Sequence, residues 1–231
     1  MENEGSLVIV TGCYGSGKTE YAVNLAAAGE PGRTMLVDLD VVNPYFRSRD
    51  LRDEFSARGI DVVAPEGSFS HADVPMLSRR VKGALRNTEK RVIIDVGGDP
   101  MGARALARFS GTIKERGYRM RLVVNTRRPQ NRTVEEVLDM AARIEAASGL
   151  VIQELVANSH LMEETTREVV EEGAAVAGEA ARQSGRDFFT VCVLEDLLPR
   201  LGEPRVQARI FALKKHLRKP WEPGSGKAWR I

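Results

Sequence analysis

The chain has 231 residues, of which 42% are hydrophobic and 29% charged, and its formal net charge is +2. These values are typical of a globular protein with one large domain or two small ones, and so small a net charge gives no reason to expect a nucleic-acid partner. Cys13 and Cys192 lie far apart, which excludes a disulfide framework or a closely spaced metal-binding pair.

No apolar segment approaches the roughly 20 residues that a membrane span needs. The first residues, MENEGSLVIV, lack the basic region and the long apolar run of a signal peptide. We therefore expect a cytoplasmic protein.

Short apolar runs rich in β-branched residues alternate with longer helical patterns along the chain. Strands are predicted over residues 7–10, 34–38, 61–64, 91–96, 121–125, 153–158 and 188–193, and helices over 19–28, 49–58, 75–87, 103–116, 134–148 and 163–184. Thr133 and Glu136 have the spacing of a capping box, which fixes the start of one helix. Most strands are apolar on both faces, as in a parallel sheet that is covered on both sides. The order predicts an α/β fold: a doubly wound, mainly parallel sheet with helices on both faces.

The last residues differ in character from the rest. We assign residues 1–203 to one nucleotide-binding domain and 204–231 to a basic C-terminal helix with a flexible tail. Val206, Ile210, Leu213 and Leu217 share one face of this predicted helix, and basic residues dominate the remainder. Packing on its own domain is the simplest interpretation, with docking of a partner or contact with an anionic membrane as alternatives.

The stretch GCYGSGKT lies between the first predicted strand and the first predicted helix. Gly12, Gly17, Lys18 and Thr19 satisfy the P-loop pattern, in which backbone N–H groups and a helix N-terminus bind phosphate. Lys18 would neutralise the β- and γ-phosphates, and Thr19 would bind Mg²⁺. The predicted nucleotide-binding segment comprises Gly12, Cys13, Tyr14, Gly15, Ser16, Gly17, Lys18, Thr19 and Glu20. A small residue filling the loop is the simpler role for Cys13, and a low-pKa thiol at the helix start is the alternative.

Two later strand ends supply acidic residues. Asp38 and Asp40 follow the second predicted strand, and Asp95 ends a strongly apolar one, followed by Gly97 and Gly98. These ends lie at the same sheet edge as the P-loop, where ligands bind. We therefore predict a metal role for Asp95 and Asp40 and a catalytic role for Lys18 and Asp40. The backbone N–H of Gly98 could reach the γ-phosphate.

These residues resemble the ParA/MinD/CobQ/CobB nucleotide-binding proteins of the SIMIBI class of P-loop NTPases. GCYGSGKT, VDLDVVNP, IIDVGGDP and LVANS occur in the order of that family, over roughly residues 6 to 200. The resemblance implies a sheet order of 3-2-4-1-5, an attacking water oriented by Asp40, and a Walker B role for Asp95. It also implies that Asn158 hydrogen-bonds the adenine edge, with residues 194–196 on the base side.

Two features depart from the family pattern. Cys13 stands where ParA and MinD carry the signature lysine of an ATP-sandwiched dimer, so a homodimer remains one option rather than an expectation. The absence of C-x-x-C argues against the branches that bridge an iron–sulfur cluster.

Three functional hypotheses follow, and the expected cofactors are ATP and Mg²⁺. The favoured one is a nucleotide switch or accessory ATPase with an unknown protein partner. The alternative is an ATP-dependent synthetase that transfers phosphate to a small carboxylate held near His71 or Arg127. A GTPase or nucleotide kinase is the third, and the absence of N-K-x-D favours adenine. Residues 43–50 could act as a phosphate sensor that meets a partner, or could simply start a helix.

Overall fold

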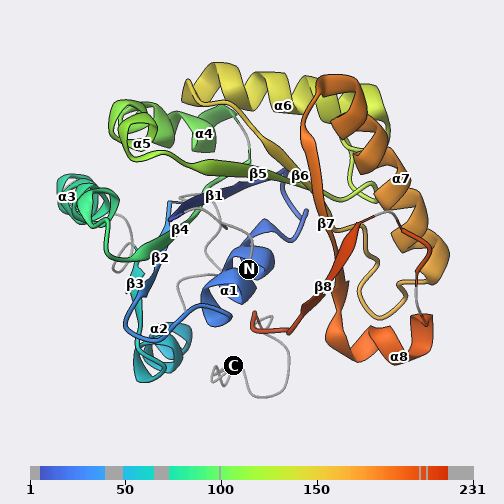
Figure 1. Cartoon of the computed structure of the whole chain (residues 1–231), viewed down its shortest axis with the longest axis horizontal. Coiled ribbons are helices and arrows are strands. Elements are labelled where there is room, and N and C mark those ends of the chain that lie inside the picture. Colours follow the sequence, from blue (N-terminus) through green and yellow to red (C-terminus); the bar gives the residue numbers. More distant parts are fainter. Residues whose placement is uncertain are drawn as a thin grey trace, which may run out of the picture.

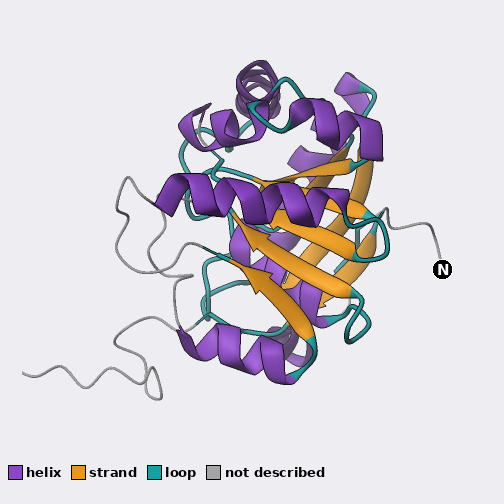
Figure 2. Cartoon of the chain, turned by 90° about the vertical axis from the view of Figure 1, so that its left-hand side faces the viewer, coloured by secondary structure: helices purple, strands orange, loops and turns teal. Residues whose placement is uncertain are grey.

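The protein is an eight-stranded parallel sheet with helices on both faces, as seen in a computed structural model (Figures 1 and 2). The structure describes residues 6–39, 49–64, 73–98, 100–202, 204–206 and 208–217. The strand order is β3-β2-β4-β1-β5-β6-β7-β8. The strands are β1 (Leu7–Thr11), β2 (Thr34–Asp38), β3 (Ile60–Val63), β4 (Arg91–Asp95), β5 (Arg119–Val124), β6 (Glu154–Ala157), β7 (Asp187–Leu194) and β8 (Arg209–Leu213). The predicted α/β fold and the order 3-2-4-1-5 are both confirmed.

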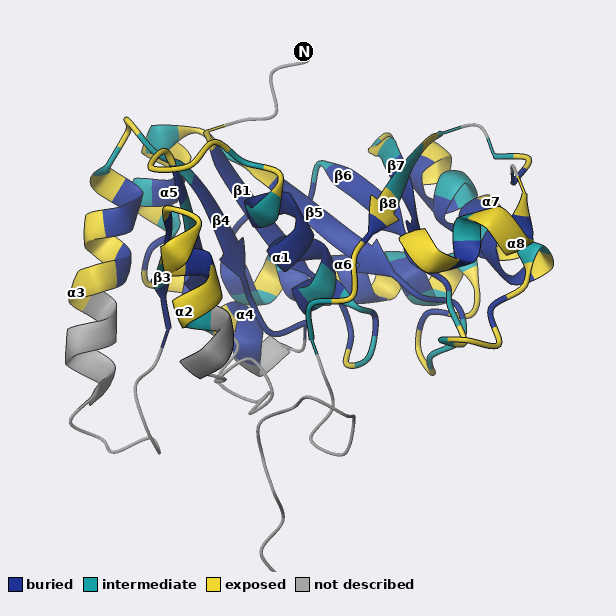
Figure 3. Ribbon diagram, turned by 90° about the horizontal axis from the view of Figure 1, so that it is seen from below, coloured by how far each residue is buried: buried dark blue, intermediate teal, exposed yellow. Residues whose placement is uncertain are grey.

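The helices divide between the two faces of the sheet. They are α1 (Lys18–Ala27), α2 (Arg49–Ala57), α3 (Asp73–Arg86), α4 (Pro100–Ala107), α5 (Ser110–Arg116), α6 (Val134–Ser148), α7 (Arg167–Ser184) and α8 (Leu198–Leu201), with a 3₁₀ turn at Glu195–Leu197. Side chains of α3 to α7 contribute to one apolar core, and those of α1 and α2 contribute to the other. Apart from the first residues of β4 and β5, the central strands β1, β4 and β5 are buried (Figure 3), because both faces are covered.

Two predicted helices differ from the structure, one because it is divided and one because it begins later. The helix predicted over residues 103–116 is two helices, α4 and α5, separated near Phe109, which caps α5 without a side-chain hydrogen bond. The helix predicted over 163–184 begins only at Arg167, where Thr166 accepts a hydrogen bond from the N–H of Val169. The capping box of Thr133 and Glu136 is present as predicted.

The predicted C-terminal helix is wrong in the described residues. Arg209–Leu213 is a strand that pairs in parallel with β7, from Thr190 opposite Arg209 to Leu194 opposite Leu213. The free edge of β7 offers backbone partners that an isolated helical pattern does not reveal. Whether residues 1–203 fold independently of the rest stays a prediction.

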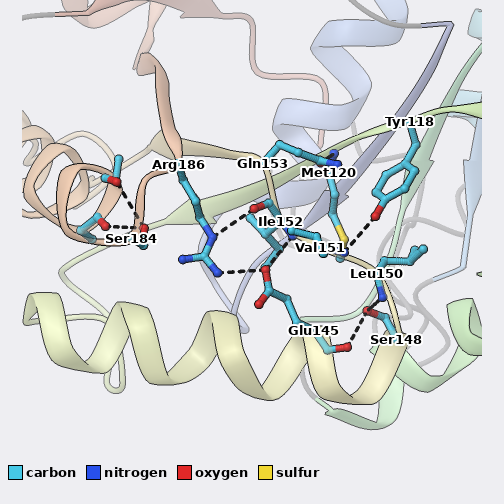
Figure 4. A network of polar contacts seen from close by, with 12 residues as sticks. Tyr118, Met120, Glu145, Ser148, Leu150, Val151, Ile152, Gln153, Ser184 and Arg186 are labelled. Atoms are coloured by element: carbon cyan, nitrogen blue, oxygen red, sulfur yellow. Dashed lines mark hydrogen bonds and ion pairs between the residues drawn. The ribbon is translucent and has the colours of Figure 1, made fainter. Parts of the chain in front are cut away.

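A network of polar contacts fixes the start of β6, which is only four residues long. Figure 4 shows the carboxylate of Glu145 accepting hydrogen bonds from the N–H of Ile152, at 2.8 Å, and from Arg186, at 2.9 Å. The side chain of Gln153 accepts a bond of 2.7 Å from the N–H of Met120 on β5. These contacts join α6, β5 and the β7 entry at the edge of the sheet opposite the P-loop.

A buried arginine ties α1 to the sheet. Arg121 on β5 is fully buried and donates to Glu154 at 2.5 Å and to the hydroxyl of Tyr21 at 3.0 Å. Its guanidinium carbon lies 3.7 Å from the centre of the Phe189 ring. The position of the helix that follows the P-loop is therefore set by hydrogen bonds as well as by apolar packing.

Candidate functional site

The P-loop connects β1 to α1 and has the backbone conformation that its glycines allow. Gly12, Gly15 and Gly17 have φ angles of 155°, 75° and 83°. Gly17 is the N-cap of α1 and no side chain caps this helix start. A helix start without a side-chain cap favours an anion, because the positive end of the helix dipole lies there.

Side chains from two neighbouring loops hold the P-loop by its carbonyl groups. Asn158, after β6, donates its amide to the carbonyl of Ser16 at 2.8 Å. Arg128 and Asn125, after β5, donate to the carbonyl of Gly15 at 3.1 and 3.4 Å. A side chain at Gly17 would not fit, since its Cβ would lie 2.2 Å from the amide nitrogen of Asn158. These contacts fix the shape of the loop without using its N–H groups.

The loop at residues 125–131 holds the P-loop, a role that no motif in the sequence predicts. Arg127, near which a carboxylate substrate was one prediction, pairs with Glu172 on α7, and Arg128 donates to Gly15. The signal available was the two asparagines that flank the arginines, because amide side chains satisfy backbone groups of irregular loops.

The end of β4 lies directly beside the P-loop. Asp95 is fully buried and is the register partner of Val10 on β1 and of Asp38 on β2. Gly98 approaches the loop so closely that a Cβ there would lie 1.6 Å from the carbonyl oxygen of Gly12. The predicted Walker B segment and the P-loop are therefore in backbone contact.

The hydroxyl of Thr19 indicates whether a metal ion fits here. Its hydroxyl is buried and makes no hydrogen bond within the described residues. A buried hydroxyl with no bond costs free energy, which a metal ion or a ligand would offset. Lys18 is buried as well, at 5% exposed. Across the described ranges no group of three or more His, Cys, Asp or Glu side chains could hold a metal ion.

A cavity of about 220 Å³ opens from the P-loop toward the carboxyl ends of β6 and β7. Its polar end is formed by the loop and its other end is largely aliphatic. The lining residues are Gly15, Gly17, Lys18, Thr19, Glu20, Asn158, Ser159, His160, Met162, Thr165, Val170, Cys192, Val193, Leu194, Leu197, Leu213, Lys215 and Leu217. Phosphate and an aromatic base are the two chemistries that such a cavity matches.

Glu20 and His160, which both line the cavity, have shifted pKa values. Burial raises the pKa of Glu20 to about 7, although its carboxylate accepts hydrogen bonds from the N–H groups of His216 and Leu217. Burial, together with the charge of Arg128, lowers the pKa of His160 to about 4, so its imidazole is neutral at pH 7. Glu20 therefore uses its side chain on the C-terminal segment, a role that its predicted place in the nucleotide-binding segment did not suggest.

Cys13 is a buried loop residue rather than an activated thiol. It is 7% exposed, and its sulfur accepts a hydrogen bond from the amide of Asn131 at 2.5 Å. Burial raises its pKa, and the nearby charges of Lys18 and Arg128 lower it by less. The low-pKa alternative is therefore wrong. Tyr14, at the tip of the same loop, is 77% exposed.

Several predicted site residues lie outside the described residues. These are Asp40, the phosphate-sensor residues up to position 48, and His71. The structure brings the others to one edge of the sheet: the P-loop, Asp95, Gly98 and Asn158. None of the helices in the described ranges is long and apolar enough to cross a membrane.

Comparison with protein families and with curated proteins gives no match. Among solved structures, the chain is similar to the cell division protein FtsY from Thermotoga maritima, with 18% identity and a TM-score of 0.54 over 81% of this chain and 61% of that one. FtsY from Mycoplasma mycoides matches with 15% identity and a TM-score of 0.52 over 84% of this chain and 61% of that one. The chain thus spans about three-fifths of the length of these neighbours. This likeness shows that the chain shares the fold of these proteins, and it does not single out the ParA/MinD/CobQ branch.

Proposed function

We propose that this protein is an Mg²⁺-dependent ATP-binding protein and ATPase of the ParA/MinD/CobQ type, which works as a nucleotide switch or accessory ATPase. The observation that carries the proposal is the uncapped start of α1. It follows three glycines with positive φ and opens into a cavity whose far end is apolar. Triphosphate would occupy the first part of this cavity and the base the second.

The proposed roles follow from where each side chain lies. Lys18 would neutralise the β- and γ-phosphates, and the buried hydroxyl of Thr19 would take a place on the metal, with Asp95 holding the metal's water shell. Bound Mg²⁺ would screen the phosphate charges and favour one arrangement of the oxygens. Gly98, already in contact with the P-loop, would present its N–H to the γ-phosphate. Asp40 would orient the attacking water.

Adenine is favoured over guanine by the polar groups at the base end. The amide of Asn158 donates to Ser16, which leaves its oxygen to accept from an exocyclic amine. Of the described residues that line the cavity, Glu20 is the one carboxylate, and it already accepts two backbone bonds. A guanine reader would need a carboxylate with accepting capacity for the N1 and N2 donors.

The synthetase alternative has less support from the described residues. It requires cationic side chains that face a carboxylate substrate, and both Arg127 and Arg128 already contact the protein itself. A synthetase would release ADP only when its substrate is added. An accessory ATPase would turn over ATP alone or with its partner, so an ATPase assay without added small molecules separates the two.

The direct test measures binding of a fluorescent ATP analogue with Mg²⁺, in competition with ATP and GTP. We expect Lys18→Ala to weaken binding about 100-fold, the scale of hydrogen bonds to charged groups. Lys82→Ala, which removes an exposed lysine of α3, is the matched control and should bind as wild type. Asp40→Ala should retain binding and lose turnover. Equal affinity of Lys18→Ala and wild type, or stronger competition by GTP, would overturn the assignment to ATP.

A further inference from the structure

One wall of the cavity comes from the C-terminal part of the chain. After β8 the chain turns toward α1 and α2 (Figure 1), and residues 214–217, here called the C-terminal strap, follow directly. Leu213, Lys215 and Leu217 line the cavity together with the P-loop. A segment almost 200 positions along the chain from the P-loop thus completes the space that the proposed nucleotide would fill.

The strap is fastened by two side chains one helical turn apart on α1. The side-chain amide of Asn24 both accepts from the N–H of Lys214, at 2.8 Å, and donates to its carbonyl, at 2.9 Å. Glu20 accepts from the N–H of His216, at 2.7 Å, and of Leu217, at 3.1 Å. Four hydrogen bonds therefore run between the strap backbone and the first turns of α1, immediately after Lys18 and Thr19.

The other side of the strap contacts α2. The ring of His216 meets that of Phe55 edge to face, with centroids 6.0 Å apart, and its Nδ1 lies 3.9 Å from Glu54. In the chain, α2 follows the segment that contains Asp40. The strap therefore touches the helix behind the P-loop, the cavity and the helix after the predicted catalytic segment.

We infer that Asn24 and Glu20 are positioning residues of the nucleotide site, which act by holding the C-terminal strap against the cavity. This inference rests on the proposed nucleotide binding. A ligand that contacts the closed strap stabilises it, and by linkage an open strap lowers the affinity for that ligand. Nucleotide binding and strap closure are thus thermodynamically coupled: each favours the other.

The closed strap is only weakly stabilised by its own contacts, so a ligand can shift its closure. Glu20 is partly buried and accepts two N–H bonds from the strap backbone. The strap itself adds only a few partly buried side chains, so its closure has little apolar area to stabilise it. A base in the cavity would bury Leu217, which is only partly buried, and so stabilise the closed strap.

The first arm of the test uses the wild-type protein and hydrogen exchange. We expect saturating Mg²⁺–ATP to slow exchange of the amides of Lys214, His216 and Leu217 about tenfold, alongside the P-loop. Slowed exchange in the P-loop with unchanged exchange in the strap would overturn the inference and leave the nucleotide proposal intact. This arm needs no variant, so a poorly folded variant does not compromise it.

The second arm removes the hydrogen bonds between Asn24 and the strap. Asn24→Ala deletes both hydrogen bonds to Lys214 and should weaken binding of the fluorescent ATP analogue about tenfold, with faster strap exchange. Asn87→Ala is the matched control, because Asn87 also makes one side-chain bond to backbone, to Glu89, in a turn outside the cavity. Wild-type affinity in Asn24→Ala would overturn the inference. Absence of binding in the wild type would instead overturn the nucleotide proposal on which it rests.

Discussion

The contact between Gly98 and the P-loop gives a quantitative prediction for Gly98→Ala. The new Cβ would lie 1.6 Å from the carbonyl oxygen and 2.1 Å from the carbonyl carbon of Gly12, both of which belong to backbone and cannot rotate away. Ordinary contact distances require the two loops to separate by roughly 1.5 Å. Overpacking of this kind costs about 1 to 3 kcal/mol, and we expect the upper end because both partners are backbone.

Two measurements on Gly98→Ala follow from this displacement. Urea unfolding should show a loss of about 3 kcal/mol, and for a chain of this size the melting temperature should fall by about 6 to 12 °C. Affinity for a fluorescent ATP analogue should fall at least about tenfold, because the P-loop N–H groups move with Gly12.

Gly83→Ala is the matched control for this variant. Gly83 lies within α3, and a Cβ there meets nothing within 4 Å, so alanine should stabilise the helix by about 0.5 to 1 kcal/mol. If Gly98→Ala unfolds and binds nucleotide as Gly83→Ala does, the backbone contact between β4 and the P-loop is wrong, and with it the place of the Walker B segment in the site.

Three further predictions concern buried polar groups. Arg121→Met leaves the carboxylate of Glu154 buried without its main partner and should lower the free energy of unfolding in urea by about 3 to 5 kcal/mol. Replacing both residues by apolar ones should lower it clearly less. Equal losses would contradict a buried ion pair between Arg121 and Glu154. Glu20 has a folded pKa of about 7 against an ordinary value of 4.5, so between these values the folded state keeps a proton that the unfolded state has released. The free energy of unfolding should therefore fall by about 2 to 3 kcal/mol as the pH rises through this window and level off above it, and Glu20→Gln should remove that slope. Burial raises the pKa of the Cys13 and Cys192 thiols, so iodoacetamide at pH 8 should label neither in the folded protein and both in urea, and rapid labelling under native conditions would contradict the burial.

The strands were predictable because most of them need no knowledge of their neighbours. The runs Leu7–Val10 of β1 and Val92–Ile94 of β4 are apolar at every position, and in a chain that alternates strands with helices this pattern favours a sheet covered on both faces. The P-loop was predictable for a related reason: its function depends on local backbone geometry, which Gly12, Gly15 and Gly17 specify within a few residues.

The C-terminal strand was not predictable from periodicity. Val206, Ile210, Leu213 and Leu217 satisfy a helical spacing, yet in β8 only Leu213 is fully buried, since the edge strand has one open side. Its conformation is decided by the unpaired edge of β7, and no local pattern contains that information. The break between α4 and α5 is similar, because neither proline nor glycine marks it and tertiary packing near Phe109 sets it.

The two ends of the candidate site also differ in how far the local sequence predicts them. The proposed phosphate-binding loop is one contiguous segment, whereas the proposed base end of the cavity is assembled from the ends of β6 and β7 and from the C-terminal strap. Most residues that contribute there, such as Val193, Leu197 and Leu213, are ordinary core residues that no motif distinguishes. A sequence can therefore predict a phosphate-binding loop without predicting which base the proposed site selects. The hydrogen bonds of Asn24 to Lys214 join the two ends, so the residues that follow a P-loop motif carry information about the whole site that the motif itself does not.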